Sequence, residues 1–347
     1  MNLNILFFYF VTAIIVLSSC SKNDPTQEND QETNPINPLP NPMEIPNIYI
    51  IVNEDYGTSG VWKNEEMMYD QLDYANCIYV SDNNDIYVAG RIGKIPVVWK
   101  NGKVLYELVD QYSEVNHIRT MYIDGDDLYL GGYSLREYDW FFAPIVWKNG
   151  KRLITYNGSK GKYLGISALR VYKGEVYAVC EDQKISSNIT SVWKNNQKLY
   201  DLPCSIANTI YVSNNDVYVT GSTTSGNVNP FIKIFKNGKE LYHIPDIGHA
   251  YSFYSDKEIF TVGYTQRSNN KQPIAQIWKN DNKLYDMPYR AEPKAIFVYG
   301  GDVYTAGNSF NVNKDNYIAY VWKNDKILYQ LTDGKGKSSD IIDMFVK

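Results

Sequence analysis

Short apolar runs separated by polar turns fill the chain from residue 47 to its end. The stretch "IYVSDNNDIYVAG" (78–90) consists of two such runs around a polar turn, which is the pattern of a β-hairpin. Five related stretches follow it, at 121–132, 169–180, 210–221, 252–263 and 296–307. The sequence therefore predicts a series of hairpins at a regular spacing.

A second phrase lies about midway between the hairpins, and "IVWKNGKRL" (145–153) is one example. Seven copies share an aromatic-Lys-Asn tripeptide, in which the aromatic residue is Trp six times and Phe once. The aromatic residues are Trp62, Trp99, Trp147, Trp193, Phe235, Trp278 and Trp322. They are 37, 48, 46, 42, 43 and 44 residues apart, a period that is typical of β-propeller blades.

One repeat contains four expected strands, for example 208–212, 217–221, 232–236 and 239–242. Four short antiparallel strands per repeat are what a propeller blade needs. We therefore predict an all-β fold, a seven-bladed β-propeller with four antiparallel strands in each blade. A β-solenoid that does not close is the alternative.

The two ends of the repeat region complement each other. The first copy begins with "NIYIIVNE" (47–54), which matches a second strand, and no first strand precedes it. The last residues, "IIDMFVK" (341–347), match a first strand, and the chain stops before the following turn. We expect the C-terminal strand to complete the first blade, because this pairing removes the open edges of an incomplete ring.

The repeated residues have structural explanations. Asparagine followed by Gly, Asn or Asp suits a type I′ turn, so the asparagine of each tripeptide is expected in a hairpin turn. The Trp lies in an apolar strand and is expected between blades rather than exposed as a sugar platform. An acid before the second strand, as at Asp127, is expected to accept bonds from turn amides. Only Lys148 and its six counterparts lack a clear structural role.

The N-terminus resembles that of a bacterial lipoprotein. An apolar run from Ile5 to Leu17 precedes Leu17-Ser18-Ser19-Cys20, which is similar to a lipobox, although no Lys or Arg precedes the run. Residues 20–45 are rich in Pro, Asn and acids and indicate a flexible tether. We predict a signal peptide at 1–19, a lipidated Cys20 with its tether at 20–45, and the propeller at 46–347. An uncleaved N-terminal anchor helix is the alternative.

Composition narrows the possible partners. The net charge of −5 without a basic stripe argues against nucleic acid. Cys77, Cys180 and Cys204 occupy unrelated repeat positions, so no disulfide framework is expected. We expect no cofactor and no metal, a monomer, and a location at the bacterial cell envelope, on the outer membrane, through the lipid on Cys20.

The lipobox, the acidic tether and the seven "WKNG"-like segments together resemble a family of Bacteroidetes-type surface lipoproteins with "WKNG" repeats. The resemblance covers nearly the whole chain and implies a propeller fold. It implies no activity, because the family has none that is settled. Similarity to Kelch repeats is distant, since only Gly131-Gly132 carries the double glycine of that repeat.

Where the repeat is broken, we expect the functional residues. The stretch "GGYSLREYDWFFAP" (131–144) is interpreted as an unusual loop that contains the one Trp outside the tripeptides. Other breaks on the same face are 243–250, 286–295 and the start of the third blade. The candidate ligand-binding residues are Trp140, Tyr138, Arg136, Asp139, Tyr289, Arg290, His249, His117 and Arg119.

No catalytic constellation emerges from the sequence. Glu137, Asp139, Glu181, Asp182 and Glu292 could supply paired carboxylates, but any propeller offers as many. The first hypothesis is a lipid-anchored, non-catalytic propeller that binds a glycan or a protein through its loop face. The alternatives are a polysaccharide-acting glycosidase or lyase, and a scaffold subunit of an envelope complex.

Overall fold

A computed structural model describes residues 46–54, 58–109, 115–136, 141–156, 159–160, 164–184, 187–223, 231–245, 248–255, 258–264, 274–287, 291–311, 316–331 and 339–347. These residues belong to one compact unit, Pro46–Lys347. The predicted signal peptide, Cys20 and the predicted tether lie outside the described residues. Within the described part of the chain, no helix is long and apolar enough to cross a membrane.

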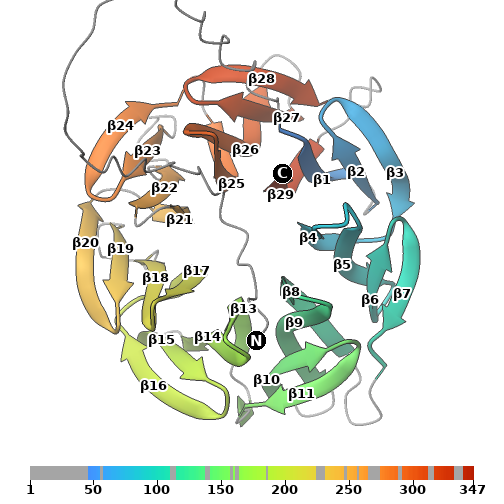
Figure 1. Cartoon of the computed structure of the whole chain (residues 1–347), viewed down its shortest axis with the longest axis vertical. Helices are drawn as coiled ribbons and strands as arrows, with labels where there is room; N and C mark the ends of the chain where they lie inside the picture. Colours follow the sequence, from blue (N-terminus) through green and yellow to red (C-terminus); the bar gives the residue numbers. More distant parts are fainter. Residues whose placement is uncertain are drawn as a thin grey trace, which may run out of the picture. The chain divides into compact units, whose positions relative to one another are not determined.

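Seven antiparallel sheets surround a central axis (Figure 1), which confirms the predicted propeller. The innermost strands are β29 (Ser339–Val346), β4 (Ala75–Val80), β8 (Val115–Asp124), β13 (Leu164–Tyr172), β17 (Ile206–Ser213), β21 (Gly248–Ser255) and β25 (Ala291–Tyr299). The second strands are β1 (Ile48–Glu54), β5 (Ile86–Ile92), β9 (Asp127–Arg136), β14 (Glu175–Lys184), β18 (Asp216–Thr223), β22 (Glu258–Tyr264) and β26 (Asp302–Asn311). We number the blades 1 to 7 in this order.

The third strand of each blade ends on the aromatic-Lys-Asn phrase, and the fourth strand forms the outer rim. The third strands are β2 (Ser59–Lys63), β6 (Ile95–Lys100), β10 (Phe141–Lys148), β15 (Ser187–Lys194), β19 (Phe231–Lys236), β23 (Ala275–Lys279) and β27 (Asn316–Lys323). The outer strands are β3 (Glu66–Leu72), β7 (Lys103–Glu107), β11 (Lys151–Thr155), β16 (Gln197–Leu202), β20 (Lys239–Pro245), β24 (Asn282–Asp286) and β28 (Lys326–Leu331). Blade 3 has an additional short strand, β12 (Ser159–Lys160), which pairs with β10.

The C-terminal strand closes the ring. β29 pairs with β1 from Ile48↔Val346 to Glu54↔Ser339, so the first and last segments of the propeller share blade 1. Side chains extend the closure to both neighbouring blades. Asn308 of blade 7 accepts the amide N–H of Ile341 at 2.8 Å, and Lys347 donates from Nζ to the carbonyl of Ser81 in blade 2 at 2.6 Å. The predicted composite blade is thus confirmed.

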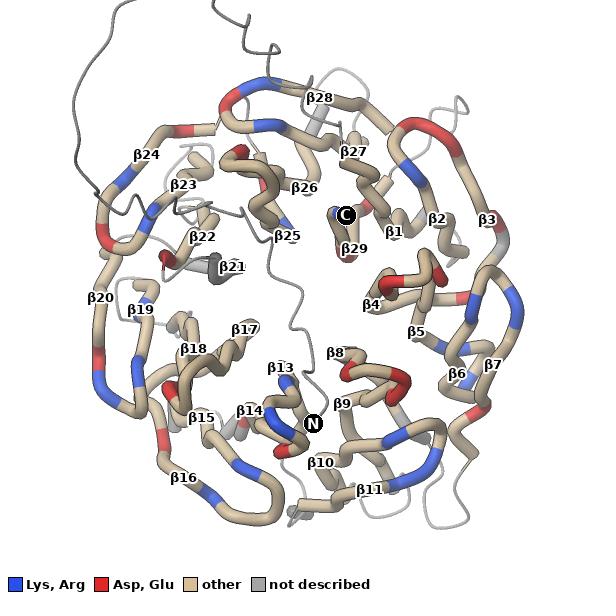
Figure 2. The backbone as a smooth tube through the Cα atoms, in the orientation of Figure 1, with Lys and Arg blue, Asp and Glu red and all other residues tan. Residues whose placement is uncertain are grey.

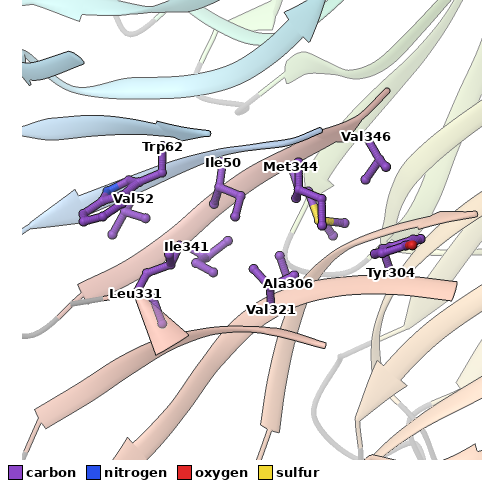
Figure 3. Packing of buried hydrophobic residues seen from close by; sticks show 13 residues of the cluster. Ile50, Val52, Trp62, Tyr304, Ala306, Val321, Leu331, Ile341, Met344 and Val346 are labelled. Carbon is purple, nitrogen blue, oxygen red and sulfur yellow. The ribbon is translucent and has the colours of Figure 1, made fainter. Parts of the chain in front are cut away.

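The core consists of apolar layers between adjacent blades. Figure 3 shows one layer, in which Trp62 and Ile50 of blade 1 pack with Met344 of β29 and with Tyr304 and Val321 of blade 7. The aromatic residues of the other tripeptides likewise join a cluster with residues of the preceding blade. Burial of one such ring stabilises the fold by on the order of 3 kcal/mol. The repeated Trp is an inter-blade packing residue, as the sequence predicts.

The four polypeptide turns of a blade alternate between two ends of the propeller. We call the end with the first-to-second and third-to-fourth strand hairpins the turn end. The opposite end, with the second-to-third connections and the crossings between blades, is the loop end. Near the loop end most innermost strands carry a one-residue register shift, for example between Ile118 and Thr120 in blade 3. This β-bulge re-aims the residue between them, Arg119.

Candidate functional site

The repeated asparagines lie at the turn end and have a structural role. All seven have positive φ, from 49° to 57°. Each side-chain oxygen accepts the amide N–H of a second-strand residue in its own blade, such as Leu128 for Asn149, at 2.8 to 3.0 Å. The following glycine also has positive φ in the three Asn-Gly turns, at Gly102, Gly150 and Gly238. Of the seven tripeptide turns, these three have the positive φ of a type I′ turn at both positions.

The lysine that lacked a role in the sequence has one in the structure. Lys148 forms an ion pair with Asp127 at 2.7 Å, and its Nζ lies 5.2 Å from the ring centre of Tyr129. The same ion pair occurs in blades 2 to 7 and the same ring contact in all seven. The hydrogen bond from Lys148 lowers the pKa of the Asp127 carboxyl. Blade 1 has Asn47 in place of the acid, and Lys63 keeps the ring contact with Tyr49.

The acid before the second strand was expected to accept bonds from turn amides. In the structure its partners are instead the side chains of the tripeptide Lys and Asn. Besides the lysine, Asp127 accepts a hydrogen bond from the side-chain amide of Asn149, at 2.8 Å. Lys148, Asn149 and Asp127 therefore tie the two hairpins of one blade together at the turn end. The tripeptide residues thus have a structural role within each blade.

The stretch 131–144 is mostly strand, contrary to its interpretation as a loop. Residues 131–136 belong to β9 and residues 141–144 to β10, and these strands pair from Phe141↔Arg136 onward. The other two breaks are also largely strand. His243–Pro245 and Gly248–Ala250 belong to β20 and β21, and Ala291–Ala295 begins β25. Cross-strand pairing near the loop end thus continues through residues that do not repeat.

The predicted site residues fall into three groups. Cys20, Tyr138, Asp139, Trp140, Tyr289 and Arg290 lie outside the described residues. Arg136 ends β9 and His249 lies in β21, but their side chains are outside the described part. His117 and Arg119 are described on β8, and the structure brings these two together with residues of blades 2 and 4.

His117 lies in an aromatic and basic environment. Its ring stacks on the buried ring of Tyr133, with a centroid distance of 4.6 Å and an interplanar angle of 19°. Burial, with the nearby Arg91 and Arg119 guanidinium groups, lowers the pKa of His117. The imidazole is therefore neutral at pH 7 and offers one hydrogen-bond donor and one acceptor.

Arg119 connects three blades. Its Nη1 lies 3.1 Å from Oε2 of Glu181 in blade 4, and Glu181 is only 3 % exposed. The other oxygen of Glu181 accepts the amide N–H of Ala207 in blade 5 at 3.3 Å. Because Glu181 holds both an ion pair and a backbone amide, it acts as a structural carboxylate, and the sequence interpretation of Glu181 as an enzyme candidate finds no support in its contacts.

Arg91 is a member of this cluster that sequence reasoning missed, whereas Tyr133 belongs to the stretch 131–144 that the sequence singled out. The Arg91 guanidinium lies 4.9 Å from the ring centre of Tyr74. Equivalent positions on the second strands of blades 2, 3 and 4 are occupied by Arg91, Tyr133 and Glu181. Each lies four residues after the tyrosine whose ring contacts the repeated lysine. That offset within the repeat was a usable signal. We define Arg91, His117, Arg119, Tyr133 and Glu181 as the loop-end cluster.

The loop-end cluster can contact a ligand by stacking and by hydrogen bonds. A half-buried imidazole and planar guanidinium groups are donors of defined direction, and His117 is the partly exposed ring of the stacked pair, since Tyr133 is buried. No group of three or more His, Cys, Asp or Glu side chains that could hold a metal occurs among the described residues. The arrangement favours binding chemistry over proton transfer between paired carboxylates.

The fold and this cluster define a seven-bladed β-propeller with a polar and aromatic group at the loop end of blades 2 to 4. The chain is similar to a protein from Lactobacillus plantarum, with a TM-score of 0.55 and 8 % identity over 87 % of this chain and 100 % of that one. It is also similar to the WD40 β-propeller domain of Doa1, with a TM-score of 0.50 and 12 % identity over 74 % of this chain and 85 % of that one. At such identities the similarity shows the fold alone. No protein-family model matches the chain, and no curated protein does.

Proposed function

We propose that this protein is a non-catalytic binding propeller that takes a glycan at its loop end and is held at the bacterial cell envelope by a lipid on Cys20. The observation that supports glycan binding is the stacked pair of His117 and Tyr133 beside two guanidinium groups. Sugar rings bind by packing their C–H faces on flat side chains while polar groups of fixed direction meet the hydroxyls. The lipobox-like segment that ends at Cys20 supports the envelope location.

The glycan is expected to contact blade 3 above all. His117 and Tyr133 both belong to this blade, and Arg136 ends the strand that carries Tyr133. Tyr138, Asp139 and Trp140 connect β9 to β10 in the sequence and remain candidates for the same surface. His249 lies in β21, Tyr289 and Arg290 precede β25 in the sequence, and these three residues remain candidates for glycan contact.

A glycan array with four forms of the protein tests the proposal: wild type, His117→Ala, Trp140→Ala and the matched control His243→Ala. His243 is exposed on the outer strand β20 of blade 5, away from the loop-end cluster. We expect wild type and His243→Ala to bind the same glycans, and His117→Ala and Trp140→Ala to bind them at least roughly tenfold more weakly, because each loses a stacking ring. If folded wild type binds no glycan, carbohydrate recognition is excluded and a protein partner at the same face becomes the leading alternative.

A further inference from the structure

Equivalent positions near the turn end of the seven innermost strands form a ring. Six blades carry an aromatic residue at this position, and blade 4 carries an arginine. Each position pairs across the strand with the aromatic residue that contacts the repeated lysine. The residues are Phe345, Tyr79, Tyr122, Arg170, Tyr211, Phe253 and Phe297. We call them the collar, and of these the side chain of Phe253 lies outside the described part.

Neighbouring members of the collar touch each other across the blade boundaries. The ring centres are 5.5 Å apart for Phe297 and Phe345, 4.8 Å for Phe345 and Tyr79, and 6.1 Å for Tyr79 and Tyr122. The Arg170 guanidinium lies 4.4 Å from the ring centre of Tyr122 and 5.1 Å from that of Tyr211. Because the innermost strands surround the axis (Figure 1), these contacts form a continuous arc around it.

Arg170 has an unusual environment within the collar. Two tyrosine rings contact its guanidinium, and in the described part of the chain this group has no ion pair and no hydrogen bond. Most Lys and Arg of the propeller lie instead on the outer strands and turns (Figure 2), and the repeated lysines there are paired with acids. A half-buried guanidinium keeps its N–H donors but has lost part of its hydration, so a ligand acceptor beside it would be favoured.

The charges around the collar restrict the ligand. Arg170 is the one cation in the collar, while Asp82 and Asp124 lie near enough to Tyr79 to raise the pKa of its hydroxyl further, after the larger effect of burial. These two acids disfavour ligands of high negative charge. Burial also raises the pKa of Tyr122, so this phenol stays neutral at pH 7. One cation surrounded by aromatic rings suits a single negative charge attached to a flat or apolar body.

We propose that the collar binds a small organic carboxylate at the turn end of the innermost strands, a site separate from the loop-end cluster. The carboxylate accepts two parallel hydrogen bonds from the edge of the Arg170 guanidinium, a geometry that arginine provides and lysine does not. The carbon skeleton packs on the rings of Tyr79, Tyr122 and Phe345. Both a sugar acid and an aromatic acid have this chemistry, and their neutral analogues distinguish the two sources.

Isothermal titration calorimetry tests this proposal with sodium glucuronate and sodium benzoate as probes, and with glucose and benzyl alcohol as their neutral counterparts. We expect at least one carboxylate to bind wild type roughly tenfold or more tightly than its neutral counterpart, because a hydrogen bond to a charged group contributes that much. Arg170→Gln should lose this preference. Arg152→Gln, on the outer strand β11, is the matched control and should behave as wild type.

Two results would overturn the proposal. Either neither carboxylate binds folded wild type, or Arg170→Gln binds the carboxylate as tightly as wild type does. Should Arg170→Gln not fold, as judged by its melting curve, Arg170→Lys keeps the charge and replaces it. The lysine variant should bind the carboxylate more weakly than wild type, since an ammonium group cannot bridge both oxygens. Neither variant changes the loop-end cluster, so this test and the glycan array fail independently.

Discussion

Asp343 of the closing strand β29 should make the stability of the propeller dependent on pH. Its carboxylate accepts the amide N–H of Ile78 in blade 2 at 3.0 Å and that of Met344 at 2.9 Å. Burial raises the pKa of Asp343 from 3.8 to about 6, and the two amide N–H bonds only partly offset this. The folded protein therefore favours the protonated carboxyl at the junction of blades 1 and 2.

The sign and size of the effect follow from this pKa. A carboxyl whose pKa is raised on folding stabilises the fold most below its unfolded pKa, and this contribution is lost as pH rises through the folded pKa. The window runs from about pH 4 to pH 7, and the loss is on the order of 3 kcal/mol at 1.36 kcal/mol per pKa unit. The side chain of Asp343→Asn does not titrate. The free energy of unfolding of this variant should therefore rise by this amount relative to that of wild type between pH 4 and pH 7.

Urea unfolding at pH 4, 5, 6 and 7 measures the difference in free energy of unfolding between Asp343→Asn and wild type. The variant also loses one acceptor for a backbone amide, which shifts the difference by a constant, so the test concerns its change with pH. Asp340→Asn, at an exposed residue of the same strand that accepts a hydrogen bond from Asn308, is the comparison variant. A difference for Asp343→Asn that stays the same from pH 4 to pH 7 would refute the reasoning.

Two further predictions concern the turns and the ring closure. Gly150→Ala should lower the free energy of unfolding by about 1 kcal/mol more than Gly93→Ala does. Both glycines have positive φ, but a new Cβ would lie 2.7 Å from the Tyr106 ring at Gly150 and would contact nothing within 4 Å at Gly93. Equal losses in urea unfolding would show that the ring contact is unimportant. Deletion of residues 341–347 should abolish cooperative unfolding of the whole propeller, since it leaves β1 without its partner. A melting curve like that of wild type would contradict the closure.

The fold could be predicted from the sequence because its determinants are local and repeated. Asn149 and its six counterparts adopt the positive φ that their turn requires, and this requirement is visible in a few adjacent residues. The closure could also be predicted, since "IIDMFVK" matched a first strand without a second one. The stretch 131–144 was misjudged because pairing such as Phe141↔Arg136 extends the hairpin there, although the residue types differ from those at the equivalent positions of other blades.

The chemistry of the two candidate sites could be predicted only in part. His117 and Arg119 were identified as candidates, but their partners come from other blades: Glu181 follows Arg119 by 62 residues. Six of the collar residues lie within the hairpin stretches of the sequence, and Phe345 lies in the C-terminal segment "IIDMFVK". Their assembly around the axis depends on the closed ring, which brings Phe345 of the last strand against Tyr79. Side-chain contacts between blades are long-range in sequence, and a pattern within one repeat does not reveal them.

A repeat protein places chemistry at equivalent positions as well as in its irregular loops. Where the same residue recurs in every blade, as with Asn149 and its counterparts, the position maintains the blade itself. Where the position recurs but the residue differs, the fold presents a different side chain at the same place around the axis. Arg170 in an otherwise aromatic ring, and Arg91 and Glu181 at either side of Tyr133, are such differences. Because the backbone is already supplied by the repeat, a single substitution at such a position is enough to create a binding group, and these positions are therefore where ligand recognition is expected.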